Sequence, residues 1–427
     1  MREDLLHFIW KTNKLHSQQL TTTKKERLSI LSTGQYNLNS GPDFFNSKIE
    51  IANQLWAGNV EIHLKSSDWY AHGHETDDNY DNVILHVVWE DDIAVFRKDK
   101  TEIPTLELKD IVPEKLLLGY KKLLQNSKKK FINCEHDLET IDGFLIDNWL
   151  ERLYIERLEE KSRLIFELLN ASNNDWEKVL FSMLLKNFGS KVNGKAFLSL
   201  SESIDFSIVR KLQNNYVSLE SVLFGMSGLL EKEECYDVYH KQLKKEYAFQ
   251  KTKFKLNDLG VERPDFFGLR PNNFPTIRLS QFAVLYAKNK NLFSKLISYS
   301  EAKDYYDLFD ITAGDYWKNH FTFGKESKSS SKRLTKNTID LILINTIVPL
   351  KFSYAKSLGK DISGDLISLM RNLGAEKNSI IKGFDEIGRK TKSAFSSQAK
   401  LQLYNNYCST NQCLKCAVGS FLLRGNH

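Results

Sequence analysis

The sequence predicts an α+β protein in which an N-terminal mixed β-sheet unit, flanked by helices, precedes a large, mainly helical body. Within residues 1–110, one stretch with helical spacing is followed by several runs that alternate or are continuously apolar, as strands do. From about residue 114 onward, apolar residues recur at the spacing of helices, with charged residues between them. We therefore expect an α/β domain over residues 1–113, a helical domain over 114–400 and a cysteine-containing segment over 401–427.

The elements of the first domain follow from this patterning. Residues 3–15 are expected to form a helix, because Leu5 and Ile9 recur on one helical face. A Gly- and Asn-rich stretch over residues 34–41 predicts a loop. Strands are expected over 44–51, 58–64, 83–89 and 93–97. In the body, the expected helices cover 147–169, 176–188, 217–230 and 280–287 and much of 295–400.

Composition and charge restrict the functional classes. The chain has 427 residues, 41% of them hydrophobic and 27% charged, which is typical of a soluble globular protein and excludes wholesale disorder or a small disulfide scaffold. The formal net charge of +6 permits a nucleic-acid partner without requiring one. The most apolar stretch, residues 339–350, is shorter than a membrane-spanning helix, and the N-terminus lacks a secretory pattern. We therefore expect a cytoplasmic protein without a membrane span; its oligomeric state is not indicated.

One expected strand carries three ionisable side chains on a single face. In this strand the apolar residues alternate with Glu61, His63 and Lys65. Asp43 lies 18 residues before Glu61, directly after a Gly-Pro pair. Burying such groups is costly unless they have partners. A divalent cation held by Asp43 and Glu61 would satisfy them, because carboxylates are ligands for Mg²⁺ or Mn²⁺, and Lys65 and His63 would then assist an attacking water. The alternative is a solvent-exposed strand face with Asp43 as a turn residue.

This arrangement resembles the PD-(D/E)XK nuclease superfamily, in which an Asp at a strand start and an acid-x-Lys on the next strand hold the metal. The resemblance implies a restriction-endonuclease-like fold and hydrolysis of phosphodiester bonds, with Asp43 as a metal ligand and Lys65 as the catalytic lysine. The sequence departs from the pattern at His63, which stands two residues before Lys65, while Glu61 stands four before it. Either His63 replaces the acid, or Glu61 is the ligand and His63 replaces the lysine, or the fold is degenerate and binds nucleic acid or a protein partner without cleaving.

Over nearly its full length the chain also resembles an uncharacterised bacterial family, domain-of-unknown-function family 2851. The matching runs include Gly-Pro-Asp-Phe at residues 41–44, Gly-Asn-Val-Glu-Ile-His-Leu at 58–64, His-Gly-His at 72–74 and Arg-Pro-Asn-Asn-Phe-Pro at 270–275. This resemblance implies a family but no activity, so function has to be argued from the site.

Histidines follow the charged strand closely. His72 and His74 lie in an expected loop after the strand, where side chains often face a cleft, while His86 lies inside an apolar run. We consider His72 and His74 candidates for general acid–base catalysis or for metal binding, and His86 a buried, hydrogen-bonded core residue. If Glu61, His63, His72 and His74 converge, a zinc or iron hydrolase becomes the rival interpretation.

Three cysteines, Cys408, Cys413 and Cys416, crowd into nine residues near the C-terminus. A structural Zn²⁺ site takes four nitrogen or sulfur ligands, so a fourth is needed, and the candidates are Cys134, Cys235 and His427. An iron–sulfur cluster would also take four thiolates, and Cys134 with the terminal three has the layout that some nucleases of the superfamily use. The alternative is a set of reduced, partly buried thiols that close the C-terminus.

Residues 240–255 interleave lysines with Tyr247, Phe249 and Phe254. Lysines neutralise phosphates and aromatic rings stack on unpaired bases, so this segment would suit a nucleic acid. The simpler interpretation is an amphipathic helix with its aromatic side chains inward and its lysines outward.

Overall fold

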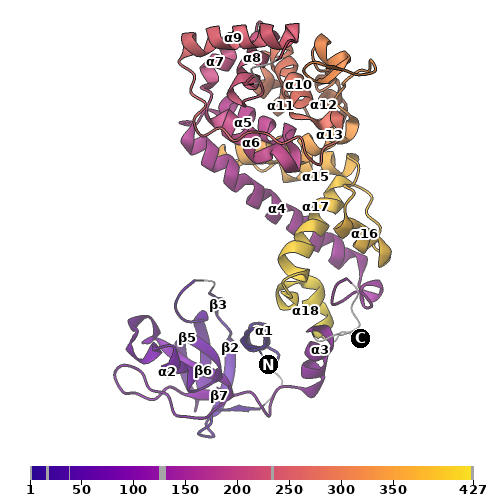
Figure 1. Cartoon of the computed structure of the whole chain (residues 1–427). Coiled ribbons are helices and arrows are strands. Elements are labelled where there is room, and N and C mark those ends of the chain that lie inside the picture. Colours follow the sequence, from indigo (N-terminus) through magenta and orange to yellow (C-terminus); the bar gives the residue numbers. More distant parts are fainter. Residues whose placement is uncertain (1, 16–18, 38, 125–130, 232–234, 425–427) are drawn as a thin grey trace. The chain divides into compact units, whose positions relative to one another are not determined.

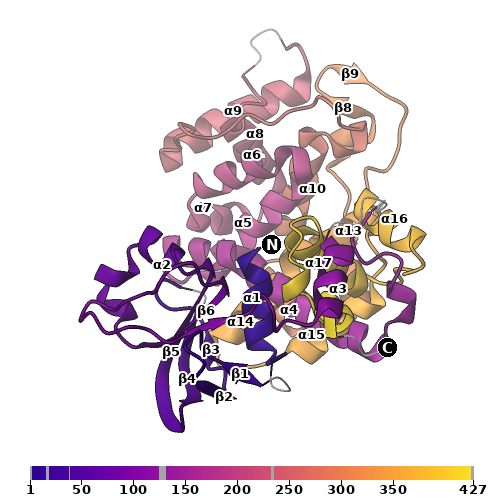
Figure 2. The same cartoon turned by 90° about the horizontal axis from the view of Figure 1, so that it is seen from below.

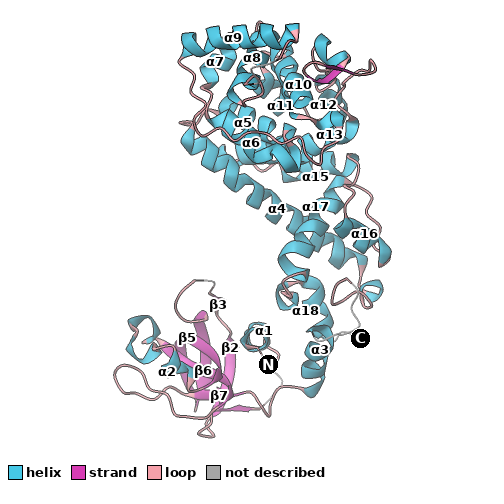
Figure 3. Ribbon diagram, viewed as in Figure 1, coloured by secondary structure: helices cyan, strands magenta, loops and turns pink. Residues whose placement is uncertain are grey.

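The computed structural model describes residues 2–15, 19–37, 39–124, 131–231 and 235–424 (Figure 1). The chain divides into two compact units, which are Met1–Trp149 with Tyr404–His427, and Leu150–Leu403. Strands are concentrated in the first, here called the sheet unit, and helices dominate the second, the helical unit (Figure 3). The α+β class, with an N-terminal mixed sheet and a largely helical body, is therefore confirmed. The residues between 114 and 149 and those after 403, which we expected outside the first domain, belong to the sheet unit.

A mixed sheet forms the centre of the sheet unit. Its hydrogen-bonded order is β1-β2-β4-β5-β6-β7, with β3 paired to β4. Neighbours are antiparallel as far as β5, whereas β5, β6 and β7 run parallel. The strands are β1 (Leu20–Thr21), β2 (Arg27–Ser32), β3 (Gln35–Tyr36), β4 (Phe44–Ile51), β5 (Gln54–Lys65), β6 (Val83–Glu90) and β7 (Thr105–Glu107).

Burial along the strands follows the sequence pattern. The first six residues of β6 are buried, as its continuous apolarity predicts, and in β5 the residues from Val60 to His63 are buried while the first part of the strand is exposed. The expected strand over residues 93–97 is wrong. This segment turns back on itself, so that Phe96 only bridges Glu102 and Ile103 N–H donates to the carbonyl of Val95.

Among the described residues, four helices belong wholly to the sheet unit. The first, α1, packs on β5 through a buried apolar face and lies beside the sheet in both views (Figures 1 and 2). It ends at Lys11 rather than at residue 15 as expected. The crossover from β5 to β6 contains α2 and two 3₁₀ turns, η1 (His74–Thr76) and η2 (Asp78–Tyr80). The four helices are α1 (Glu3–Lys11), α2 (Asp68–Ala71), α3 (Glu114–Leu124) and α18 (Ala417–Arg424).

The long helix α4 (Gly143–Ala171) begins in the sheet unit and continues into the helical unit. Capping side chains explain several helix starts there; Asp175, for example, accepts the backbone N–H groups of Glu177 and Lys178. A short hairpin, β8 (His320–Thr322) with β9 (Lys325–Glu326), interrupts the helices. The other helices are α5 (Trp176–Phe188), α6 (Ser190–Glu202), α7 (Phe206–Leu212), α8 (Tyr216–Met226), α9 (Val238–Phe254), α10 (Pro275–Lys288), α11 (Leu292–Ser298), α12 (Ala302–Leu308), α13 (Lys336–Ile342), α14 (Val348–Ser357), α15 (Ser363–Asn372), α16 (Ser379–Glu386) and α17 (Ala394–Leu403).

One helical stretch in the described part of the chain is long and apolar enough to cross a membrane. It runs over Lys336–Ser357, through α13, a π-helical turn and α14, and so exceeds the apolar run that the sequence marked at 339–350. Within the helical unit 72% of its most apolar window is buried, as in the core helix of a packed domain.

Candidate metal centre

A cavity of about 380 Å³ lies in the sheet unit, where β4 begins and the buried part of β5 passes beside it. Side chains from α1, from β5 and from the crossover between β5 and β6 form its wall. Many of them are ionisable: Glu3, Asp43, Glu61, His63, His72, His74, Asp77 and Tyr80. Such a concentration of titratable groups in one hollow is typical of functional sites.

The pairing of β4 with β5 brings together Asp43 and Glu61, the two predicted metal-binding carboxylates. Phe44 pairs with Val60 in this antiparallel ladder, so the preceding Asp43 lies beside Glu61. The backbone N–H of Asp43 donates to Glu61 Oε2 at 3.0 Å, and the N–H of Ile62 donates to Asp43 Oδ2 at 3.0 Å. Each carboxyl group is therefore held by the backbone of the other strand, and both line the same cavity.

The three histidines that the sequence grouped together converge on Glu61. His63 lies on β5, His72 follows α2, and His74 begins η1. One ring nitrogen of each lies within 4.8 Å of the other two. His63 Nε2 and His74 Nε2 lie 3.4 and 3.3 Å from Glu61 Oε1, and His72 Nδ1 lies 3.1 Å from His63 Nε2. Nitrogen atoms at this spacing, with a carboxylate oxygen beside them, fit a transition-metal ion.

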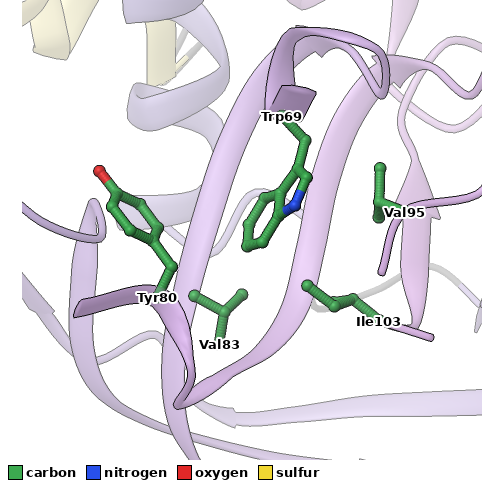
Figure 4. Packing of buried hydrophobic residues seen from close by; sticks show 5 residues of the cluster. All are labelled: Trp69, Tyr80, Val83, Val95 and Ile103. Carbon is green, nitrogen blue, oxygen red and sulfur yellow. The ribbon is translucent and has the colours of Figure 1, made fainter. Parts of the chain in front are cut away.

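A buried hydrophobic cluster fastens the histidine-bearing crossover to the sheet. The Trp69 indole, from α2, lies between Tyr80 on one side and Val95 and Ile103 on the other (Figure 4). His74 stacks on the ring of Tyr80 with centroids 3.8 Å apart, and its ring contacts Trp69 at 5.3 Å. The cluster therefore fixes the position of His74 from two sides. Its members are Trp69, Tyr80, Val83, Val95 and Ile103.

His86, on the neighbouring strand β6, supports the site through its contact with His63. It is fully buried in β6, and its Nε2 lies 2.9 Å from His63 Nδ1. The expectation of a buried, hydrogen-bonded histidine agrees with this position. When His63 carries its proton on Nδ1 and donates it to His86, its Nε2 lone pair faces the cavity, which is the tautomer that binds metal. The Nδ1 atom of His86 and the Nε2 atom of His74 have no hydrogen-bond partner among the described residues.

Burial governs the electrostatics of the centre. Desolvation, together with the neighbouring rings of His86, His74 and His72, lowers the pKa of His63 to about 2. Burial likewise lowers the pKa of His74 and, with His74 nearby, lowers that of His86 to about 3. The imidazoles of His63 and His86 are thus neutral at pH 7, and neutral imidazole is the form that acts as a ligand. Burial and the adjacent charge of Asp43 raise the pKa of Glu61 well above its usual range.

Lys65 is not brought to this centre. Its side chain is 55% exposed, its Nζ lies 4.0 Å from Asp92 Oδ2, and it does not line the cavity. The alternation correctly assigns Lys65 and Glu61 to the same face of β5. However, the two residues are four positions apart, which corresponds to about 13 Å along a strand. Sharing a strand face does not bring two side chains to one ion.

Two residues of α1, His7 and Glu3, belong to the site, and the sequence pattern did not single them out. His7 Nε2 lies 3.1 Å from Asp43 Oδ2, and its Nδ1 lies 3.4 Å from the Tyr36 hydroxyl. Burial alone would lower the pKa of His7, but the hydrogen bond and charge of Asp43 more than compensate and raise it. Glu3 lies one helical turn before His7 and itself lines the cavity, whereas His7 reaches the site through Asp43. The sequence did contain a signal for this pair, because Glu3 and His7 are four residues apart and therefore share a helix face.

The predicted cysteine ligands gather at a second cavity in the sheet unit. Cys134, Cys408, Cys413 and Cys416 all line it. Burial raises the pKa of the Cys134 thiol to about 12, with smaller contributions from Cys416 and Cys413. The other candidates differ: Cys235 belongs to the helical unit, and His427 lies outside the described residues.

Comparison with known proteins supplies a family. The chain matches a family described as "Protein of unknown function (DUF2851)" over residues 3–379. Neither the curated proteins nor the solved structures gave a significant match. Any activity must therefore be inferred from the residues of the centre itself.

Proposed function

The chain belongs to the DUF2851 family, and we propose that it is a metal-dependent hydrolase that cleaves phosphodiester bonds at the cavity beside β4 and β5. The observation that carries this proposal is the convergence of three imidazole nitrogens within 4.8 Å, next to a buried carboxylate. A hydrolytic metal site commonly takes three protein ligands and leaves a position for water.

The donor set selects the kind of metal. Imidazole nitrogens suit Zn²⁺, Mn²⁺ or Fe²⁺, whereas Mg²⁺ prefers oxygen ligands. His63, His72 and His74 would hold the ion, which supplies a water of lowered pKa when bound. Asp43 is held by Ile62 N–H and His7, so its carboxylate is positioned to take a proton from that water. Glu61, between His63 and His74, either completes the ligand set or orients the water.

Phosphodiesters are the proposed substrates because the centre keeps the carboxylate pair of the nuclease pattern. Asp43 precedes one strand and Glu61 lies on its antiparallel neighbour, in a mixed sheet where α2 crosses from β5 to the parallel β6. We propose that this unit is a variant of the PD-(D/E)XK core in which Glu61, displaced by two residues, supplies the second acid and histidines take the place of the lysine. An arrangement in which Asp43 and Glu61 alone hold Mg²⁺ or Mn²⁺ would use the same cavity.

The helical unit offers a surface that supports a nucleic-acid partner. Along α9 most lysines are exposed, and Phe249 is 59% exposed rather than turned inward as an amphipathic helix would have it. The Nζ of Lys253 lies over the ring of Phe249 at 5.6 Å from its centroid. Exposed rings beside lysines can stack on bases while the lysines neutralise phosphates.

The test is metal analysis of purified protein together with cleavage assays on single- and double-stranded DNA and RNA in Zn²⁺, Mn²⁺, Fe²⁺ or Mg²⁺. We expect His74→Ala to lose the bound metal and at least 100-fold in activity. Lys65→Ala is the matched control, because it removes a charge from the same strand outside the cavity, and it should stay within about threefold of wild type.

Two results would contradict the proposal. One is a wild-type protein that binds no transition metal at this centre, and the other is a His74→Ala variant as active as wild type. Tight nucleic-acid binding without turnover in any metal would instead favour the non-catalytic alternative, which the exclusion of Lys65 from the cavity makes worth testing.

A further inference from the structure

Cys134 and three cysteines near the C-terminus, which lie far from it in the sequence, surround one small cavity in the sheet unit. Cys134 precedes α4, Cys408 ends a π-helical turn (Tyr404–Cys408), and Cys413 and Cys416 flank a 3₁₀ turn (Cys413–Lys415). The cavity has a volume of about 20 Å³. That is about the space of one water-sized occupant. The cavity is lined by largely buried sulfur atoms, which are soft ligands, whereas the centre beside β5 offers oxygen and nitrogen atoms.

Hydrogen-bond donors are directed at two of these sulfurs. The side-chain N–H of Asn133 donates to Cys413 Sγ at 3.3 Å. The backbone N–H groups of Val418 and Gly419, in the first turn of α18, donate to Cys416 Sγ. Burial raises the pKa of Cys416, and these N–H groups oppose that rise because they stabilise the thiolate, the form of cysteine that binds a metal ion.

The backbone around this cavity is unusually close-packed. A Cβ atom on Gly419 would lie 2.1 Å from the carbonyl oxygen of Cys413, so the first turn of α18 can approach the Cys413–Cys416 loop only because residue 419 is glycine. This close approach brings the N–H groups of α18 to the sulfur of Cys416. Cys413 and Cys416 also have the spacing, two residues between them, that zinc sites commonly use.

We propose that Cys134, Cys408, Cys413 and Cys416 bind a single Zn²⁺ ion as a structural site. Four sulfur ligands match the tetrahedral preference of zinc. The small cavity fits one ion rather than a four-iron cluster. Bound zinc ties the segment before α4 to the C-terminal segment that carries α18. This site is independent of the histidine centre, so either can fail without the other.

The experiment uses the full chain, with every cysteine variant made in a His74→Ala background. The His74→Ala background removes the proposed ion of the histidine centre, so that remaining metal reports on the cysteines. We expect one equivalent of zinc per chain in that background, lost in Cys416→Ser and retained in Cys235→Ser, a matched cysteine outside the cavity. Replacing zinc by Co²⁺ should produce sulfur-to-cobalt charge-transfer absorption, and chelation should speed proteolysis after residue 403.

Three results overturn the proposal. These are iron with acid-labile sulfide in place of zinc, the absence of metal in the His74→Ala background, and zinc retained by both Cys416→Ser and Cys134→Ser. If Cys416→Ser fails to fold, the Co²⁺ spectrum of the chelated and reloaded His74→Ala protein decides instead. A spectrum without sulfur charge-transfer bands then overturns the site.

Discussion

Glu220 in the helical unit and Glu61 in the sheet unit are both buried, but their carboxyl groups differ in their hydrogen-bond partners. Glu220, in α8 of the helical unit, is fully buried and accepts hydrogen bonds from the Trp317 indole at 2.8 Å and from the hydroxyls of Tyr239 and Ser280. Glu61 in the sheet unit is almost as buried, but it accepts one backbone N–H and otherwise faces histidines beside Asp43.

The difference teaches how to separate structural from functional ionisable groups. The helical unit also contains the partly buried Lys161, whose ammonium donates to the Ile344 carbonyl, Asn345 Oδ1 and Gln398 Oε1. A buried polar group whose hydrogen bonds are complete stabilises a fold, whereas incompletely bonded groups around a hollow are available to a ligand. Burial and a shifted pKa occur in both units, so neither property alone identifies a site.

The largest effect that tests this comparison is on stability. Glu220→Gln should lower the free energy of unfolding by about 3 kcal/mol, because an amide NH₂ in place of Oε2 cannot accept the hydrogen bond from the Tyr239 hydroxyl and is left buried without a partner. Glu61→Gln should change it by less than about 1 kcal/mol, because the amide oxygen keeps the Asp43 N–H bond and the raised pKa already leaves Glu61 largely uncharged at pH 7. Urea unfolding followed by tryptophan fluorescence measures both, and the reverse order would invalidate the comparison.

The next effect concerns the support beneath the histidine centre. His86→Leu should weaken metal affinity 10–100-fold, because His63 Nδ1 loses the partner that orients its ring. His86→Gln, which keeps a polar atom near His63, should lose less. Isothermal titration with Zn²⁺ and Mn²⁺ distinguishes the variants. Equal affinities in wild type and His86→Leu would show that His86 is only a packing residue.

A smaller effect is expected from pH in the helical unit. Lys178 donates to the carbonyls of Ser201 and Ile204, and burial lowers its pKa to about 8. Between about pH 8 and the unfolded pKa near 10.4, the unfolded chain binds the proton more tightly, so stability rises with pH. Relative to Lys178→Met, the wild-type unfolding free energy should gain about 1 kcal/mol from pH 7.5 to 9.5. Parallel curves for the two proteins would refute this.

The smallest effect is expected at the exposed end of β5. Lys65→Ala removes a surface ion pair with Asp92 and should change the free energy of unfolding by less than about 0.5 kcal/mol. The metal affinity of the histidine centre should not change, because Lys65 lies outside the cavity. A loss of metal on this substitution would mean that Lys65 moves into the centre in solution.

Local pattern predicted much of the sheet unit but not its edges. The strand at 44–51 was predicted because its end alternates between buried and more exposed residues. The strand beginning at Val83 was predicted because every residue of β6 up to Val88 is buried, so its sequence is almost continuously apolar. The runs at β2 and β3 were missed, since they are short and largely exposed. The expected strand at 93–97 failed because Val95 packs into the Trp69 cluster from a turn.

Composition, periodicity and spacing alone determined the α+β class, the shared face of Glu61 and His63, the histidine group and the crowded thiols, because each depends on residues close along the chain. Only the tertiary structure decided that His7 reaches Asp43, that His86 lies under His63, that Cys134 meets the C-terminal cysteines, and that Lys65 stays outside. These depend on strand pairing and helix packing, which act between residues distant in sequence and which a period of two or 3.6 residues does not encode.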